Sequence, residues 1–281
     1  MNNRIVVGIN GKPSGDAALL WALDYANARN DEVELVHVVD DKWTTVTRSL
    51  TGTALLDAEH ELRSRAERAV EEHPGLHVHP TVLEGSPIDA LLERADGADL
   101  LVIGTHDVGR FQGVVHSTRA AHVAALSTTS VAIVPRGRER SGSGVVVGVD
   151  GSASSVAALG FGAREADRLG QTLTAVYAWQ ALTPWELVEE LNPPDPSESD
   201  KMILAEAVAG LAEEYPDLSI VQSLSRVLPV DALMNASLGG RLLVVGTHGR
   251  HGVAKMWLGS VSHELVLAMP CAVVVVKPAA V

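Results

Sequence analysis

The chain has 281 residues, about twice the commonest domain size of roughly 100–150, so it holds either one large domain or two small ones. A hydrophobic content of 46% and a charged content of 20% predict a folded globular protein and exclude an intrinsically disordered chain. The net charge of −13 argues against general binding to nucleic acid or to an anionic membrane, and no apolar run approaches the roughly 20 residues that a membrane-spanning helix needs.

The predicted strand near the start of the chain has a second copy further on. The sequence Val-Gly-Ile-Asn-Gly at residues 7–11 returns as Val-Gly-Val-Asp-Gly at residues 147–151, an offset of 140. The sequence Gly-Thr-His that begins at Gly104 returns at Gly246, an offset of 142. Because the register holds over most of each half, we predict a tandem duplication.

The repeat predicts two domains, at residues 1–136 and 144–281, with a charged and then Gly/Ser-rich seam between them. In the second domain, the continuous apolar run at residues 145–149 predicts a strand that is buried on both faces. Ser152 or Ser154 can cap the helix that follows. The further features predicted there are, in chain order, a helix end at Gly170, a strand at 172–179, an acidic loop at 192–200, a helix at 201–215, a strand at 219–227, a helix at 230–236, a strand at 242–246, a helix at 260–268 and a strand at 272–276.

Strands that alternate with helices predict an α/β fold in each half, with a parallel sheet and helices on both of its faces. Ligands of such sheets bind outside the carboxyl ends of the strands, where the strand order reverses. The acidic loop at residues 192–200 follows the second strand of its half, and its counterpart in the first half lies around residues 40–55. Both loops could therefore close over a bound ligand.

The most informative segment begins at Gly246, where the fourth strand of the second half ends. Glycines leave the backbone open to a ligand and adopt a positive φ readily, so a glycine turn can aim several N–H groups at one anion. Gly259 and Ser260 then begin the last helix, whose unpaired N–H groups and positive dipole end attract phosphate. Alternatively, these glycines make only a tight turn and a helix cap.

The spacing of Gly246, Gly249 and the pair Gly259-Ser260 is similar to the G-x2-G-x9-G-[S/T] signature of the ATP-binding universal stress proteins. The chain resembles the tandem members of that family found in actinobacteria. The resemblance implies, in each half, an open parallel sheet of five strands in the order 3-2-1-4-5, with adenosine between the first and fourth strands. It implies ATP with magnesium in the second domain, and no separate metal site is evident.

The resemblance also implies a role for individual residues of the second domain. Gly148 and Asp150 would lie near the ribose and phosphates, Asp150 could help to hold a divalent cation, and the backbone of Ala178 would face adenine. The expected nucleotide-binding residues of the second domain are Gly148, Asp150, Ala178, Gly246, Gly249, Arg250, Gly252, Gly259, Ser260, Val261 and Ser262.

The first domain departs from the signature at several positions. Gly104 is kept, but Asp107 and Ser117 stand where the second and third glycines are expected, and Asn10 stands where the other half has an aspartate. A carboxylate at Asp107 would face phosphate oxygens, and two like charges that close cost on the order of a few kcal/mol. We therefore expect the first domain to bind ATP weakly, to bind something else or to serve as a scaffold. Its weaker candidate residues are Gly8, Asn10, Val38, Gly104 and Thr118.

These features favour a regulatory nucleotide-binding module of the stress response, with no catalytic residue assigned. Two alternatives stay open, which are a slow magnesium-dependent ATPase that uses the same site and a nucleotide-free interaction protein. The Val-rich closing strands at residues 131–134 and 273–276 suggest that the two domains pair within one chain; a homodimer and an unidentified protein partner are left open. A single cysteine excludes an intrachain disulfide and predicts a cytoplasmic location.

Overall fold

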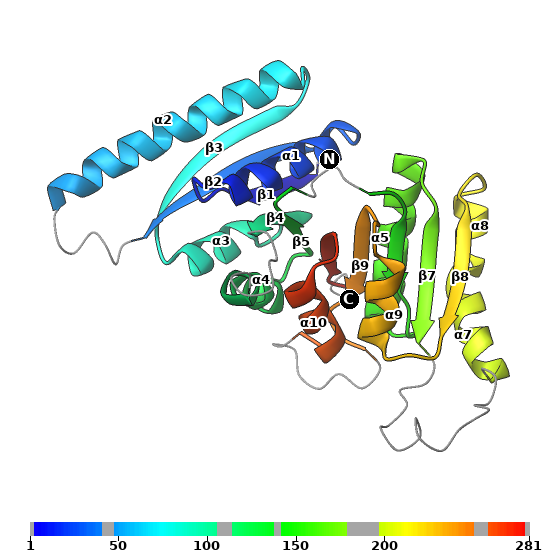
Figure 1. The fold of residues 1–281 in the computed structure, drawn as a ribbon. Coiled ribbons are helices and arrows are strands. Elements are labelled where there is room, and N and C mark those ends of the chain that lie inside the picture. Colours follow the sequence, from blue (N-terminus) through cyan, green and yellow to red (C-terminus); the bar gives the residue numbers. More distant parts are fainter. Residues whose placement is uncertain are drawn as a thin grey trace. The chain divides into compact units, whose positions relative to one another are not determined.

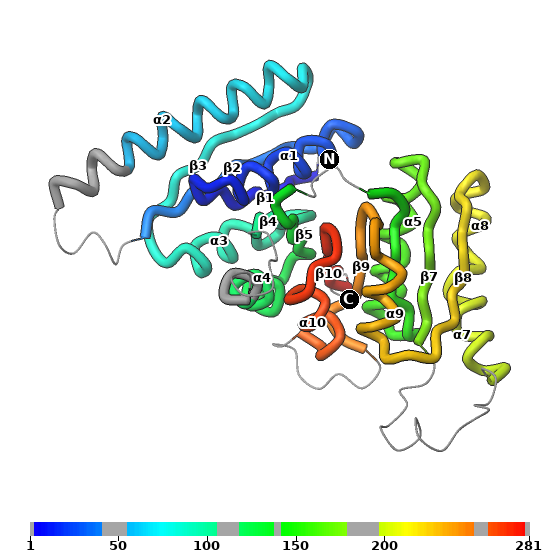
Figure 2. Tube along the Cα trace, in the orientation of Figure 1, coloured from blue at the N-terminus to red at the C-terminus, as the bar shows by residue number. Residues whose placement is uncertain are grey.

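The computed structural model describes residues 3–40, 48–105, 114–137, 142–178, 197–249 and 258–278, with residues 48–54 and 114–117 described by their backbone alone. The chain divides into two compact units, Met1–Arg140 and Ser141–Val281. In both units the trace runs along a strand and returns through a helix before the next strand, so that neighbouring strands are parallel (Figure 2). No helix of the described ranges combines the length and the apolar character needed to cross a membrane.

The first unit contains one parallel sheet of five strands. Its strands lie in the order β3-β2-β1-β4-β5, so the order reverses between β1 and β4. Its elements are β1 (Arg4–Gly8), α1 (Pro13–Asn27), β2 (Glu32–Asp40), α2 (Arg48–Glu72), β3 (His77–Gly85), α3 (Pro87–Ala95), β4 (Leu100–Thr105), α4 (Val114–Leu126) and β5 (Val131–Pro135).

The second unit repeats this topology. Its strands lie in the order β8-β7-β6-β9-β10, which is again 3-2-1-4-5 when they are numbered within the unit. Its elements are β6 (Val145–Gly148), α5 (Ala153–Leu169), β7 (Leu173–Ala178), α7 (Glu198–Ala209), α8 (Leu211–Glu214), β8 (Ile220–Ser225), α9 (Pro229–Ala236), β9 (Leu242–Gly246), α10 (Ser260–Ala268) and β10 (Ala272–Val276).

Helices cover both faces of each sheet. In the first unit α1 and α2 share one face, linked by an ion pair between Arg65 and Asp16, while α3 packs against α4 on the other. In the second unit α5 packs against α7 and α9 packs against α10 (Figure 1). The central strands are buried on both sides and consist mainly of Val, Leu and Ile, as expected for a parallel sheet covered by helices. The structure confirms the predicted α/β fold and strand order.

A buried carboxylate holds part of the first unit together. Glu34 of β2 has a side chain only 5% exposed, and it accepts hydrogen bonds from Arg94 Nε at 2.7 Å and Thr81 Oγ1 at 2.7 Å. Arg4 Nη1 adds a third contact at 3.1 Å. Burial alone would raise the pKa of Glu34, but these donors outweigh burial and lower it. The network therefore ties β1, β2, β3 and α3 together.

The ends of α5 agree with the signals in the sequence. Ser152 is the N-cap, and its side chain accepts a hydrogen bond from the backbone N–H of Ser155. Gly170 ends the helix in the left-handed conformation, with φ of 60°. Both predicted boundaries are confirmed.

The prediction for the second helical stretch of the second unit was wrong in two respects. The helix predicted at residues 201–215 begins earlier, because Ser197 and Asp200 form a capping box ahead of α7, and it is interrupted at Gly210 before α8. The predicted acidic loop therefore gives way to a capped helix at Ser197, and residues 192–196 of it lie outside the described residues. Its counterpart around residues 40–55 is also shorter than predicted, because α2 already begins at Arg48.

Candidate functional site

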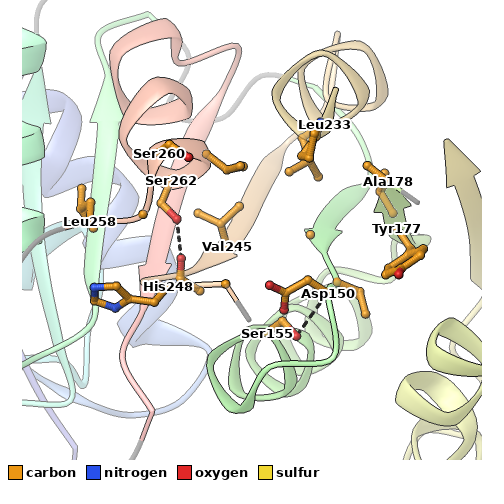
Figure 3. A pocket seen from close by; sticks show the side chains of 18 residues that line it. Asp150, Ser155, Tyr177, Ala178, Leu233, Val245, His248, Leu258, Ser260 and Ser262 are labelled. Carbon is orange, nitrogen blue, oxygen red and sulfur yellow. Dashed lines mark hydrogen bonds between the residues drawn. The ribbon is translucent and has the colours of Figure 1, made fainter. Parts of the chain in front are cut away.

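A cavity of about 550 Å³ opens at the carboxyl ends of β6 and β9, where the strand order of the second unit reverses. This is the position at which open α/β sheets bind their ligands. Figure 3 shows Asp150 and Ser155 on one side of the cavity and Leu233 on the other. Its lining residues are Gly148, Val149, Asp150, Ser155, Val176, Tyr177, Ala178, Pro229, Leu233, Val245, Gly246, His248, Gly249, Leu258, Gly259, Ser260, Val261 and Ser262.

Asp150 is held in the cavity wall by a local turn. Its Oδ1 accepts a hydrogen bond from the backbone N–H of Ser152 at 2.9 Å, the arrangement in which an aspartate closes its own turn. The backbone N–H of Asp150 donates to Ser155 Oγ at 3.4 Å. The second carboxylate oxygen, Oδ2, lies close to Gly249. The sequence therefore places one fixed negative charge beside the glycine loop.

The glycines of the signature allow close packing. The prediction that they are needed for a positive φ was wrong. Gly246, Gly249 and Gly259 do not adopt a positive φ. A Cβ on Gly246 would lie 2.8 Å from the backbone carbonyl of Ser154, so this glycine lets β9 end against the first turn of α5. A Cβ on Gly249 would lie 2.6 Å from Asp150 Oδ2. Their missing side chains make room for other parts of the protein.

The start of α10 offers backbone N–H groups to the cavity. Gly259 is its N-cap and provides no side-chain cap, and the first N–H groups of any helix lack partners within the helix. The helix start is fixed in place because Gly259 N–H donates to the carbonyl of Thr247 at 2.8 Å. Ser262 Oγ also donates to the carbonyl of Gly246 at 2.6 Å. The positive end of α10 is thus anchored at the cavity, where its field would attract an anion.

The other end of the cavity is apolar. Ala178 at the end of β7, Leu233 of α9 and Val245 of β9 line it. Tyr177 also lines the cavity, but its hydroxyl donates to Asp200 of α7 at 3.1 Å. This end can accommodate a flat apolar group, while the α10 end can hold an anion.

The structure brings together the predicted residues that it describes. Gly148, Asp150, Ala178, Gly246 and Gly249 line one cavity, and so do the four residues at the start of α10, which are Gly259, Ser260, Val261 and Ser262. Arg250 and Gly252 lie outside the described residues. The participation of each residue in ligand binding stays a prediction.

Several lining residues were missed by the sequence analysis. Pro229 and Leu233 are four residues apart on α9 and so share a helix face, and this spacing is repeated in the first half at Pro87 and Leu91, a signal that could have identified them. His248 lines the cavity too, and its Nε2 atom is buried with no hydrogen-bond partner in the described ranges. No sequence pattern distinguishes this histidine from a surface one.

The corresponding positions of the first unit differ in detail. Asn10 makes the same turn as Asp150, accepting from the backbone N–H of Lys12 at 3.1 Å, and Gly8 and Val38 lie on β1 and β2. Thr118 lies in the second turn of α4, whereas the matching Ser260 is the first residue of α10. The sequence differs at two further positions. Asp107 lies outside the described residues, and Ser117 is described by its backbone alone.

Gly104 has the same packing role as its counterpart in the second unit. A Cβ on Gly104 would lie 1.6 Å from the carbonyl oxygen of Ser14, at the first turn of α1. No side chain is compatible with that approach. The glycine at this position therefore serves the fold in both units.

A smaller cavity of about 210 Å³ lies in the first unit between the ends of β1 and β2 and helix α2. His37 lines it and bonds through Nδ1 to the carbonyl of Ile9 at 2.8 Å. Arg65 also lines it and is engaged by Asp16 and Glu61. Arg65 is thus already paired with carboxylates, and this cavity does not correspond in position to the one in the second unit.

Comparison with known proteins matches both units to the same family. The universal stress protein family matches residues 1–135 and again residues 144–277. A universal stress protein of Mycobacterium tuberculosis is 30% identical over 288 residues, covering 97% of this chain and 96% of the relative, and one of Mycolicibacterium smegmatis is 27% identical over 98% of this chain and 97% of the relative.

Solved structures agree at the level of the fold. The crystal structure of a universal stress protein from Archaeoglobus fulgidus is 17% identical, covers 99% of both chains and has a TM-score of 0.76. A universal stress protein structure from Pseudomonas aeruginosa, also 17% identical, covers 99% of this chain and 94% of its own, with a TM-score of 0.63. On the strength of the two family matches, one in each unit, the chain belongs to the universal stress protein family.

Proposed function

We propose that the second unit binds an adenine nucleotide, ATP with magnesium, in the 550 Å³ cavity, and that the protein is a regulatory nucleotide-binding module of the stress response. The observation that carries this proposal is the combination within one cavity of an apolar end with an anchored, uncapped helix start. Cavities of about 300–1,000 Å³ are usual for small-molecule ligands. A nucleotide presents the matching combination of a flat base and a charged phosphate chain.

The phosphates would lie at the start of α10. The N–H groups of Ser260, Val261 and Ser262 fall in the first turn of this helix, where intrahelical partners are missing. Gly249 and Gly259 border the same region without side chains that would obstruct the approach of phosphate oxygens. Backbone donors of this kind add nothing to the net charge, so an acidic protein can still hold a triphosphate.

The adenosine would lie at the other end, between the ends of β6 and β9. Ala178, Leu233 and Val245 offer an apolar surface for the base. Asp150 lies between the two ends, where a carboxylate can accept hydrogen bonds from ribose hydroxyls or contact a magnesium ion. Over the ranges that the structure describes, no three His, Cys, Asp or Glu side chains form a metal-binding group, so the proposed cation enters with the phosphates of its nucleotide.

The first test of the proposal is the nucleotide content and affinity of the purified protein. We expect denaturation to release about one adenine nucleotide per chain, and calorimetry on the stripped protein to show one ATP site. ATP that is recovered intact after long incubation supports a regulatory site, whereas steady conversion to ADP supports the slow ATPase. If ATP at millimolar concentration neither binds nor shifts the unfolding midpoint, the proposal is wrong.

The variant Ser260→Glu separates ligand binding from folding. A carboxylate in the first turn of α10 interacts favourably with the helix dipole, so the unfolding midpoint should stay unchanged or rise slightly. The same carboxylate repels phosphate, so ATP affinity should fall by about tenfold or more. Thr118→Glu at the matching position of the first unit is the control and should leave ATP affinity unchanged. Equal ATP affinity in Ser260→Glu and the unmodified protein would place the phosphates elsewhere.

A further inference from the structure

The side chain of Tyr177 connects the wall of the cavity to a helix outside it. Tyr177 and Ala178 are the last two residues of β7, and both line the apolar end of the cavity (Figure 3). Tyr177 is only 7% exposed, and its hydroxyl donates to Asp200 Oδ1 of α7 at 3.1 Å. A ligand at this end of the cavity would therefore lie beside the residue that bonds to α7.

Asp200 uses its second carboxylate oxygen to cap the same helix. Its Oδ2 accepts a hydrogen bond from the backbone N–H of Ser197 at 3.1 Å, and its own backbone N–H donates to Ser197 Oγ at 3.2 Å. One carboxylate thus joins the cavity wall to the capping box of α7. When the first turn of α7 opens, the Tyr177 hydroxyl loses this partner as well.

The first turn of α7 is the end at which this helix opens more easily. Ser197, Glu198 and Ser199 are exposed, whereas the buried residues of α7, Leu204 and Val208, lie in its second half. Segments with few buried apolar contacts open at a low cost in free energy. The first turn can therefore respond to a small change at the cavity.

The first unit uses the matching strand position differently. His37 corresponds to Tyr177 at the offset of 140, and it bonds through Nδ1 to the carbonyl of Ile9 at 2.8 Å, just after β1. The helix that follows, α2, forms its ion pair with α1, between Arg65 and Asp16. The hydrogen bond from this strand position to the cap of the next helix is therefore a feature of the unit that we propose to bind nucleotide.

We propose that the hydrogen bond between Tyr177 and Asp200 couples nucleotide binding to the first turn of α7, whose order then reports an occupied site. This inference rests on the proposed nucleotide site and names the surface through which that site regulates.

The coupling follows from the space around the Tyr177 ring. When the first turn of α7 opens in the empty protein, the buried hydroxyl needs a new partner, because an unpaired buried hydroxyl is costly, and the ring can turn toward the cavity to reach water. A base at the apolar end fills the space into which the ring would turn. Nucleotide therefore disfavours the open first turn, and by linkage the closed first turn favours nucleotide.

Hydrogen exchange with and without ATP tests the coupling in the full-length protein. ATP is added at a concentration that saturates each variant, as verified by calorimetry, and exchange is followed in residues 197–203 and at the start of α10. In the unmodified protein, ATP should slow exchange in residues 197–203 by about threefold or more. In Tyr177→Phe, which keeps the ring and removes the hydroxyl, exchange there should change by less than about 1.5-fold when ATP is added.

Ser197→Ala is the matched control, because it loosens the same turn and keeps the bond between Tyr177 and Asp200. Exchange in residues 197–203 should be faster in this variant than in the unmodified protein, yet ATP should still slow it by about threefold. Asp200→Ala removes the bond from the other side and should lose the response to ATP as Tyr177→Phe does, so it decides the question if Tyr177→Phe does not fold.

The start of α10 separates failure of the coupling from failure of the site. If ATP slows exchange there but not in residues 197–203, or slows both segments equally well in Tyr177→Phe, the coupling is wrong and the proposed site stands. If the unmodified protein does not bind ATP, both proposals are wrong.

Discussion

Replacing Gly246 with alanine tests whether this glycine is needed for packing or for a ligand. The new Cβ would lie 2.8 Å from the backbone carbonyl atoms of Ser154, whereas ordinary contacts begin at 3.4 Å, so β9 and α5 must separate by about 0.6 Å. The first turn of α5 cannot yield easily, because Ser152 caps it and Ser154 Oγ donates to the carbonyl of His248. Overpacking of this kind costs about 1–3 kcal/mol, which lowers the unfolding midpoint of the second unit by about 3–10 °C.

Two other glycine-to-alanine variants provide matched controls. Gly104→Ala creates the same kind of clash with the first turn of α1 in the first unit, so it should also be strongly destabilising. We do not expect the first unit to bind ATP well, so this variant tests packing apart from the ligand. Gly148→Ala brings its Cβ only to 3.1 Å from Leu233 Cδ1, the mobile end of a side chain. It should therefore cost less than about 1 kcal/mol, yet weaken ATP binding by turning Leu233 into the cavity.

The assay measures the unfolding midpoint and the ATP affinity of each variant separately. The packing explanation requires that Gly246→Ala lowers the midpoint in the absence of nucleotide, and that Gly104→Ala does the same in the first unit. If Gly246→Ala keeps the midpoint of the unmodified protein and loses only ATP affinity, the glycine serves the ligand and the packing explanation is wrong.

Glu34→Gln should destabilise the first unit by about 1–3 kcal/mol, seen as faster hydrogen exchange in β2, because it removes the charge that Arg94 pairs with. Burial alone would raise the pKa of Glu34, but its donors lower it, so this stabilisation is present at neutral pH and is lost as the pH falls below about 4.3. If the unfolding midpoints of the variant and of the unmodified protein change with pH in the same way, the prediction is wrong. Ser262→Ala should cost about 1 kcal/mol in unfolding free energy and reduce ATP affinity a few-fold in calorimetry, because it frees the start of α10 from β9. Tyr177→Phe should leave ATP affinity within about threefold but speed hydrogen exchange in the first turn of α7, because its hydroxyl bonds to Asp200.

The sheet and the short helices could be predicted because their boundaries are marked locally in the sequence. β9, α10 and β10 have the predicted bounds. β9 ends at Gly246, α10 ends before the Met-Pro pair at residues 269–270, and β10 ends before Lys277 and Pro278. The start of α7 could have been predicted too, because Ser197 and Asp200 have capping-box spacing. The interruption at Gly210 could not, since a glycine inside a helical pattern is often tolerated.

The candidate site was predicted only in part, because a sequence pattern gives positions and not contacts. The spacing of Gly246 and Gly249 drew attention to a loop that lines the cavity, but the atoms that lie closest to those glycines belong to Ser154 and Asp150, more than 90 residues away. The apolar wall contributed by Leu233 depends on how α9 packs over β6 and β7. Such distant contacts become visible only when the chain is folded.

The two units share one fold but differ at the position of the candidate site. Their sheets share one strand order, and a glycine ends the fourth strand against the helix after the first strand in both. The difference lies in where the last helix begins. α10 begins at Ser260, whereas α4 begins at Val114, four residues before the matching Thr118. Four residues are about 6 Å of helix, so the unpaired N–H groups that we propose as phosphate donors in the second unit have no counterpart at Thr118.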